Sequence, residues 1–196
     1  QKLYEQGLIT YMRTDSTNLS GLAINTAKKF INDNFGEEYS KVRQYKTKSK
    51  GAQEAHEAIR PTYISEHEID GTTQEKRLYE LIWKRTIASQ MADAETEKTI
   101  IRINISGQEY EFVASGEIIV FDGFLKVYRE SFDDESAEQE VDDTLIPPVS
   151  VGQQLDYTEI TATERYTQQP ARYNEASLVR KLEELGIGRP STYAPT

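Results

Sequence analysis

Three side chains near the amino terminus have the types and the spacing to act on a phosphate ester. The stretch LITYMRTDS places Tyr11, Arg13 and Asp15 at every second position. Its β-branched and aromatic residues favour a strand, in which side chains two apart share a face, so the Tyr11 phenol and the Arg13 guanidinium would point the same way. The planar guanidinium can hydrogen-bond a phosphate oxygen, and its charge favours the phenolate. Tyr11 is therefore a candidate nucleophile with Arg13 as its electrostatic partner.

Attack by Tyr11 on a phosphodiester would replace one ester by another. The product would be a covalent ester between protein and nucleic acid, and the step would be reversible without ATP. A plainer interpretation stays open, because a free phenol has a pKa of about 10 and a tyrosine–arginine pair is common on half-exposed strands. Asp15, likewise, is typical of a helix cap or a turn. Spacing alone does not decide between a nucleophile and a structural tyrosine.

His56 and Arg60 form a second candidate pair. The stretch AQEAHEAIRP predicts a short helix that ends at Pro61, and residues four apart lie on one helical face. Together the two side chains could grip a phosphate and keep the imidazole protonated beside it. The alternative is a surface histidine with an ordinary hydrogen bond. Glu57 is interpreted as part of the exposed surface of the same helix.

A third candidate lies near the carboxyl end, in the stretch GIGRPST. Pro190 fits the first turn of a helix whose free N–H groups could hold a phosphate, and Arg189, Ser191 and Thr192 would add a charge and two hydroxyls. An ordinary capped helix start explains the same residues equally well. No group of His, Asp and Glu has a convincing metal-ligand spacing, so the ligands of any Mg²⁺ are expected outside this chain.

The composition is that of a folded protein with a core. Of the 196 residues, 37% are hydrophobic, which is enough for one large domain or two small ones. The absence of cysteine excludes disulfides and cysteine nucleophiles. No apolar run approaches the roughly 20 residues that cross a bilayer, and no signal peptide is visible. We expect a soluble cytoplasmic protein without membrane contact, and the ends at Gln1 and STYAPT suggest a piece of something longer.

The net charge of -10 argues at first against a nucleic-acid partner. The charge is uneven, however: residues 1–60 carry ten Lys or Arg against seven Asp or Glu, residues 61–165 carry nine against 23, and residues 166–196 carry four against three. A basic stretch lies at 41–50. A local phosphate-binding surface therefore remains open, beside the alternative of a solvated lysine-rich loop.

Residues 1–92 are predicted to be mainly helical around one short strand at Tyr11. One helix, in the stretch STNLSGLAINTAKKFINDNFG at 16–36, begins at a serine cap and stops at Gly36. The clearest helix covers 72–92 and opens with a capping box of Thr72 and Glu75. Its expected core stripe consists of Leu78, Leu81, Ile82, the Arg85 stem, Ala88 and Ala92.

Residues 93–165 change to an antiparallel β pattern, with strands expected at 98–105, 109–115, 117–128 and 153–163. Within this part, 130–148 is too acidic and too poor in apolar residues to pack, so we interpret it as a mobile loop rather than an acidic binding tail. A helix with an Asn174 cap and a Gly186 stop then opens a second helical unit, 166–196. The predicted fold class is α+β with several domains.

Three long stretches together resemble bacterial DNA topoisomerase I, a family of type IA enzymes. They are GLITYMRTDSTNLS at 7–20, AQEAHEAIRPT at 52–62 and PARYNEASLVRKLEELGIGRPSTYA at 170–194, in the family's order and at fitting separations. Met12 in TYMRTDS favours this branch over topoisomerase III or reverse gyrase. The resemblance implies a winged-helix-like tyrosine domain at 1–92, a β arch that opens as a gate, and the start of a helical DNA-binding domain.

The resemblance also implies roles for the candidate residues. Tyr11 would form a 5′-phosphotyrosine bond with one DNA strand, Arg13 would position the scissile phosphate and Asp15 would support the site. His56 would contact DNA near the break. The remaining DNA-binding positions would be Arg60, Arg189, Ser191 and Thr192.

The resemblance also implies a catalytic domain that is not part of this sequence. The family's Toprim domain supplies an acidic Mg²⁺ site and a catalytic lysine, and it would precede Gln1. The expected partner is a single-stranded region of negatively supercoiled DNA, and the piece itself is expected to be a monomer. A non-catalytic single-stranded DNA-binding scaffold, in which Tyr11 only stacks on a base, is the alternative.

Overall fold

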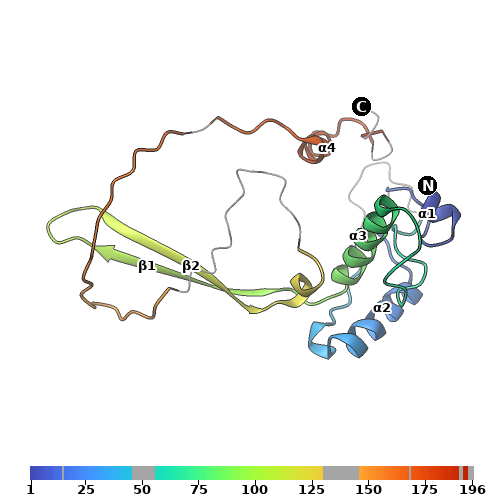
Figure 1. Ribbon diagram of the computed structural model, residues 1–196, viewed down its shortest axis with the longest axis horizontal. Helices are drawn as coiled ribbons and strands as arrows, with labels where there is room; N and C mark the ends of the chain where they lie inside the picture. Colours follow the sequence, from blue (N-terminus) through green and yellow to red (C-terminus); the bar gives the residue numbers. More distant parts are fainter. Residues whose placement is uncertain (15, 46–55, 130–145, 168, 190–191, 194–196) are drawn as a thin grey trace. The chain divides into compact units, whose positions relative to one another are not determined.

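The computed structural model contains four α-helices, two short 3₁₀ helices and one two-stranded sheet among the residues it describes (Figure 1). The described residues are 1–14, 16–45, 56–129, 146–167, 169–189 and 192–193. The elements are α1 (Lys2–Glu5), α2 (Gly21–Asn34), η1 (Glu37–Tyr39), α3 (Thr73–Ser89), β1 (Glu95–Asn104), β2 (Glu111–Phe121), η2 (Gly123–Lys126) and α4 (Glu175–Glu184).

The chain divides into two compact units. Unit 1 comprises Gln1–Glu95, Phe121–Ser131 and Glu175–Thr196, and unit 2 comprises Thr96–Val120 and Phe132–Asn174. Asp15, Ser191 and most of the acidic segment 130–148 lie outside the described residues. None of the described helices is long and apolar enough to cross a membrane.

Helix α2 forms as its sequence predicts. The Ser20 hydroxyl accepts a hydrogen bond from the Ala23 N–H at 3.3 Å, which satisfies one of the free donors at the helix start. At the other end Gly36 has a φ of 114°, a conformation that favours glycine. The face that α2 buries carries Ala23, Ile24, Ala27 and Ile31.

Helix α3 has the predicted capping box but buries a different face from the one expected. The Thr72 hydroxyl and the Glu75 carboxylate each satisfy a backbone donor of the other residue. The predicted stripe is wrong at Leu78 and Leu81, which are 49% and 45% exposed, and right at Ala88, which is buried. The buried residues of α3 are Tyr79, Trp83, Thr86, Ile87 and Ala88.

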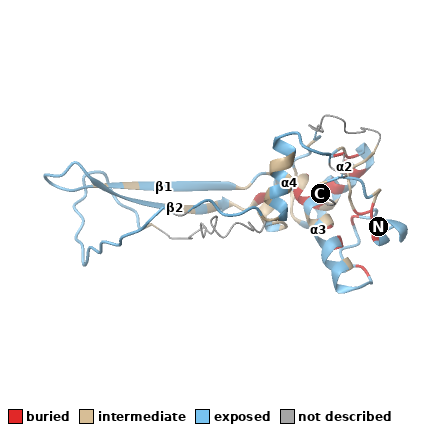
Figure 2. Ribbon diagram, turned by 90° about the horizontal axis from the view of Figure 1, so that it is seen from above, coloured by how far each residue is buried: buried red, intermediate tan, exposed pale blue. Residues whose placement is uncertain are grey.

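The core of unit 1 is aromatic as well as aliphatic, and Figure 2 shows its buried residues among the helices. Trp83 is central: its indole N–H donates to the Ile64 carbonyl at 2.9 Å, and its ring lies 5.7 Å from the Phe30 ring. Other buried members are Leu3, Ile9, Ala27, Ile31, Ile64, Ile69, Tyr79, Ile87 and Met91.

The strand predicted around Tyr11 is reduced to a single bridge at Ile9, and Tyr11 and Arg13 themselves lie in no strand. Ile9 pairs with Pro61 in an isolated antiparallel bridge, flanked by hydrogen bonds from Thr10 N to the Arg60 carbonyl and from Thr62 N to the Leu8 carbonyl. The helix predicted over 52–61 is wrong for its described part, because residues 56–61 form no helix. Backbone groups of this segment form hydrogen bonds with residues far away in sequence instead.

Among the described residues of unit 2, the predicted β domain reduces to one hairpin. The second and third expected strands are largely one continuous strand, β2, which pairs with β1. Residues 153–163 form no strand, and part of the third expected strand is η2. The fold class is therefore mixed α and β with a two-stranded sheet, rather than a wider antiparallel domain.

Helix α4 ends in the way its glycine predicts. Gly186 has a φ of 68°, its N–H donates to the Glu183 carbonyl at 3.0 Å, and the Ile187 N–H donates to the Leu182 carbonyl at 2.9 Å. These two bonds are those of a Schellman motif, which satisfies carbonyls left free at a helix end.

Candidate functional site

The structure brings Tyr11, Arg13 and His56 together within unit 1. The Tyr11 and His56 ring centroids are 5.1 Å apart, and the Arg13 guanidinium carbon lies 5.7 Å from the centre of the Tyr11 ring. Tyr4 of α1 packs against Tyr11 from another direction, at 5.3 Å and with an interplanar angle of 71°. The phenol thus lies among two rings and a cation, an arrangement that restricts its orientation.

Thr10 fastens the Tyr11 segment to the segment that carries His56. Its hydroxyl donates to the Ala58 carbonyl at 2.7 Å and accepts from the Arg60 N–H at 2.9 Å. The Thr10 N–H also donates to the Arg60 carbonyl. Both the backbone and the side chain of Thr10 therefore bind the His56 segment. Residues 48 to 50 positions apart in sequence are held in register by these bonds.

A further pair of bonds ties the His56 segment to the start of α2. The Ala58 N–H donates to the Asn18 carbonyl at 2.7 Å, and the Ser20 N–H donates to Glu57 Oε1 at 2.8 Å. The three segments around the site are therefore joined by backbone hydrogen bonds rather than by exposed side chains alone. Such bonds fix positions more tightly than surface ion pairs do.

Glu57 and Arg60 form a brace beside the site. The Arg60 Nε and Nη2 atoms each lie 2.9 Å from a different oxygen of Glu57, and Nη1 donates to the Pro61 carbonyl at 2.9 Å. Burial raises the pKa of the Glu57 carboxyl, but the hydrogen bonds from Arg60 and Ser20 outweigh it, so the pKa lies below its usual value. In this structure the Arg60 guanidinium is therefore hydrogen-bonded to the Glu57 carboxylate and to a backbone carbonyl, and its role in DNA binding stays a prediction.

The sequence does not reveal the role of Glu57, because its position predicts only an exposed helix surface. Its spacing of three residues before Arg60 suits an ion pair, but the signal that distinguishes it is its bond to Ser20, 37 residues away. Tyr4 was also missed, because nothing in the short α1 sequence marks it as a neighbour of Tyr11. Both residues owe their importance to contacts across the fold.

Of the carboxyl-terminal candidates, Arg189 and Thr192 are described and meet in a turn. The Arg189 carbonyl accepts from the N–H groups of Thr192 at 2.8 Å and Tyr193 at 3.2 Å, and the Thr192 hydroxyl accepts from the Arg189 N–H at 3.0 Å. Pro190 and Ser191 lie outside the described residues, so the predicted helix start stays a prediction.

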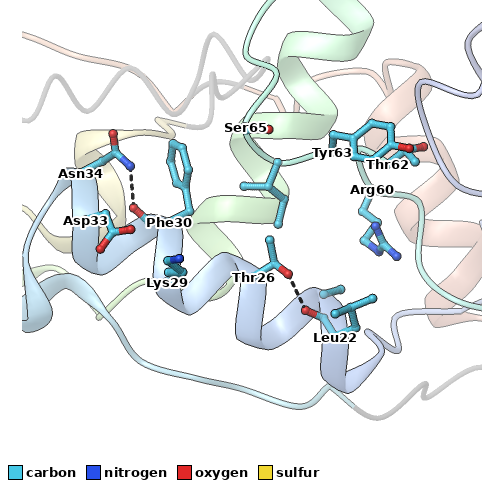
Figure 3. Close-up of a pocket in the computed structure, with 12 residues that line it drawn as sticks. Leu22, Thr26, Lys29, Phe30, Asp33, Asn34, Arg60, Thr62, Tyr63 and Ser65 are labelled. Atoms are coloured by element: carbon cyan, nitrogen blue, oxygen red, sulfur yellow. Dashed lines mark hydrogen bonds between the residues drawn. The ribbon is translucent and has the colours of Figure 1, made fainter.

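A hollow of about 380 Å³ lies between α2 and the segment that follows Arg60. Figure 3 shows side chains that line it. Lys29, Phe30 and Asp33 line it from the helix, and Thr62 and Tyr63 line it from the other side. Arg60 lies at its end. Basic and acidic side chains face this hollow together, so its lining carries no clear preference for an anion.

Within the described residues, no group of three or more His, Cys, Asp or Glu side chains could hold a metal ion. This part of the chain therefore does not fit a Mg²⁺ centre, and no chemical step is derived through a metal.

The whole chain, residues 1–196, matches the model of a family described as DNA topoisomerase. DNA topoisomerase 1 of Mycolicibacterium smegmatis is 52% identical over 206 residues, which cover 99% of this chain and 22% of that protein. DNA topoisomerase 1 of Rickettsia bellii is 49% identical over 210 residues, covering 99% and 26%. Full-length topoisomerase I from Thermotoga maritima has a similar structure, with a TM-score of 0.63 at 34% identity over 96% of this chain. The chain spans 22% to 29% of the length of these relatives.

Proposed function

This chain belongs to the bacterial DNA topoisomerase I family of type IA enzymes, and on that premise we propose that Tyr11 is the nucleophile that opens one DNA strand. The observation that carries the proposal is the cluster of Tyr11 with Arg13 and His56, two groups suited to a phosphate. We propose that the full protein relaxes negatively supercoiled DNA in the cytoplasm, at the nucleoid, by passing the other strand through the break.

The reaction is a transesterification in each direction. The Tyr11 phenol oxygen forms a bond to the phosphorus, the bond from phosphorus to the 3′ oxygen breaks, and the phenol proton ends on the released 3′ hydroxyl. Resealing reverses these changes, so no ATP is consumed. Arg13 would bind a non-bridging phosphate oxygen, where its fixed charge would stabilise the negative charge of the transition state.

His56 would contact the DNA next to the break. Its ring lies beside the Tyr11 ring, and the backbone bonds at Ala58 hold its segment in place. Asp15 is proposed to support the site, and Arg189, Ser191 and Thr192 to contact single-stranded DNA.

The chemistry also needs groups that we expect outside this chain. Oriented charges act together in catalysis, and the family's Mg²⁺ site and lysine belong to a Toprim domain. We therefore propose that the 196-residue chain alone does not cleave DNA efficiently. A labelled single-stranded oligonucleotide that becomes covalently attached to this chain in a denaturing gel, with Mg²⁺ present, would contradict this.

The second candidate is a DNA-contacting scaffold in which Tyr11 only stacks on a base. The aromatic neighbours Tyr4 and His56 favour it, because grouped rings also serve as stacking platforms. The same region of topoisomerase III or reverse gyrase is a narrower alternative within the enzyme class.

Replacing Tyr11 by Phe in the full-length protein distinguishes the two candidate functions, a nucleophile and a DNA-contacting scaffold. The ring is kept and the attacking oxygen is lost, so we expect relaxation of negatively supercoiled plasmid to disappear while DNA binding is retained. The matched control is Tyr63→Phe, since Tyr63 is 61% exposed and its ring has no recorded aromatic contact among the described residues. Substantial relaxation by the Tyr11→Phe protein would leave the scaffold as the better function.

A further inference from the structure

The sequence contains two Asp–Gly pairs, Asp70–Gly71 and Asp122–Gly123, and both lie in unit 1. An aspartate followed by glycine can react with its own backbone, because glycine has no Cβ to keep its amide nitrogen away from the aspartate carboxyl. Unit 1 places the two pairs in different surroundings. A difference in their reactivity must therefore come from the fold.

The first pair is unprotected. Asp70 and Gly71 form an exposed bend directly before α3. No described residue is hydrogen-bonded to, or ion-paired with, the Asp70 carboxylate. The Gly71 N–H, likewise, donates to no acceptor in the described part of the chain. The carboxyl carbon of Asp70 can therefore approach the Gly71 nitrogen without breaking an existing bond.

The second pair is held by its side chain and by its backbone. The Tyr39 hydroxyl donates to Asp122 Oδ1 at 2.7 Å, and the Asp122 carbonyl accepts from the Leu125 N–H at 2.9 Å. Gly123 is buried, and an added Cβ would come within 2.7 Å of the Ala92 carbonyl oxygen. The Asp122 carboxyl must leave Tyr39 before it can turn toward the Gly123 nitrogen, so reaction requires a local opening of unit 1.

We propose that Asp70 is a site of spontaneous isoaspartate formation and that the fold protects Asp122 from the same reaction. The Gly71 nitrogen forms a bond to Cγ of Asp70, and the amide proton and the carboxyl hydroxyl leave as water. The product is a five-membered succinimide ring. Water then adds to one of the two ring carbonyls. Cleavage of the bond from nitrogen to Cγ restores aspartate, whereas cleavage at the α-carbonyl leaves the backbone running through Cγ beside a free α-carboxylate. The water lost in the first step is regained in the second.

The position of Asp70 links this modification to α3. An isoaspartyl residue adds one methylene carbon to the backbone between Ile69, which is 9% exposed in the core of unit 1, and Thr72, the cap of α3. The space is already limited at Gly71, where an added Cβ would lie 3.0 Å from Glu75 Oε2. The longer backbone must therefore displace the core residue or the Thr72–Glu75 capping box, which stabilises the helix start.

Peptide mapping of the 196-residue chain after prolonged incubation at neutral pH tests the proposal, with electron-transfer fragmentation to distinguish isoaspartate from aspartate. We expect isoaspartate to accumulate at least about tenfold faster at Asp70 than at Asp122, because Asp122 reacts only from opened states. In concentrated urea the two rates should become similar, which shows that both pairs can react. The matched variants are Asp70→Glu, which would need a six-membered ring and should remove the product at this position, and Asp122→Glu, which should leave the yield at Asp70 unchanged.

A second readout labels the product itself. An isoaspartyl-specific methyltransferase transfers a labelled methyl group from S-adenosylmethionine to the free α-carboxylate, and the label should appear in the wild-type chain but not in Asp70→Glu. The purified isoaspartyl form should unfold at a urea concentration lower by about 0.3–1 M, followed by the fluorescence of Trp83 in α3. An unchanged midpoint would contradict the effect on α3. Equal rates at the two aspartates of the folded chain, a faster rate at Asp122, or no isoaspartate at Asp70 while the unfolded chain converts would each overturn the proposal.

Discussion

Units 1 and 2 hold their backbones in different ways. Unit 1 has a buried core in which Ile31, Ile87 and Met91 are fully inaccessible to solvent. The unit 2 hairpin leaves large apolar side chains exposed on both strands: Ile100, Phe112, Val113, Ile118 and Val120. A hairpin without a covering layer is marginally stable in water. Since Tyr11, Arg13 and His56 all belong to unit 1, their geometry should depend on its core and not on the hairpin.

The largest contrast is expected from the same isoleucine truncation in each unit. Ile87→Ala removes a side chain that is 0% exposed, and the cavity should lower the free energy of unfolding of unit 1 by about 3–5 kcal/mol. Ile118, at 38% exposed, already contacts water, so Ile118→Ala should change that free energy by less than about 0.5 kcal/mol.

The single tryptophan makes this contrast measurable. Trp83 is the only tryptophan of the chain and lies in the core of unit 1, so its fluorescence in a urea titration reports on that unit. A comparable loss for Ile118→Ala would show that the hairpin contributes to the stability of unit 1.

Local chemistry explains which elements the sequence predicted. The Ser20 cap, the Thr72–Glu75 box and the Gly186 stop each act over three to five residues, and the structure contains all three. Such signals depend on neighbouring backbone groups and need no knowledge of the fold.

The errors arose where distant contacts decide. Helix α3 has apolar residues on two faces. The buried face contains Tyr79 and Trp83, whose side chains donate hydrogen bonds to the carbonyls of Glu66 and Ile64, respectively. No periodicity reveals such acceptors. The helix expected around His56 failed for a related reason, because long-range backbone bonds replace those of a helix.

The candidate site, too, contains residues that the sequence predicts and residues that only long-range contacts reveal. Strand alternation predicted that Tyr11 and Arg13 would lie together, and the structure places them so. The approach of His56 to Tyr11 could be expected only from the resemblance, since 45 positions separate the two in sequence. Tyr4 and Glu57 could not be predicted, because each gains its role from a partner across the fold. The chemical roles themselves remain predictions.

Two glycines with positive φ provide the second contrast. Gly123 has a φ of 48°, and an added Cβ would come within 2.7 Å of the Ala92 carbonyl oxygen. Gly107, in the hairpin turn, has a φ of 77° with open space around it. We expect Gly123→Ala to destabilise unit 1 by about 2–3 kcal/mol through strain and overlap.

For Gly107→Ala we expect only the cost of placing a non-glycine residue at positive φ, about 1 kcal/mol. The unfolding transition reported by Trp83 should stay unchanged. The urea titration followed by Trp83 fluorescence checks both variants. Equal shifts for the two would mean that the close approach at Gly123 relaxes freely.

The third contrast compares two carboxylates with an arginine partner. Glu57 is held by Arg60 and Ser20, so Glu57→Gln should cost unit 1 about 1–2 kcal/mol. Glu111 pairs with Arg102 across the exposed hairpin, and Glu111→Gln should cost less than about 0.5 kcal/mol.

The pH dependence tests the same carboxylate. The pKa of Glu57 lies below its usual value of 4.5, so its stabilising effect is complete above that pH and is lost as the pH falls through the lowered pKa. Unit 1 should therefore lose stability below pH 4.5, and Glu57→Gln should reduce that loss when urea titrations are compared across the acid range. An unchanged acid dependence would assign the loss to other carboxyls.

The smallest expected effect concerns Tyr4, whose ring edge meets the Tyr11 ring. An aromatic pair contributes about 0.5–1.5 kcal/mol, so Tyr4→Ala in the full-length protein should slow relaxation by about two- to tenfold while DNA binding stays unchanged. Tyr4→Phe keeps the ring and should restore the rate. The unit 2 control is Tyr110→Ala, at 79% exposed, with no expected change. If Tyr4→Phe were as slow as Tyr4→Ala, the hydroxyl rather than ring packing would matter. The orientation of Tyr11 would then depend on a hydrogen bond and not on the aromatic packing that distinguishes unit 1 from the hairpin.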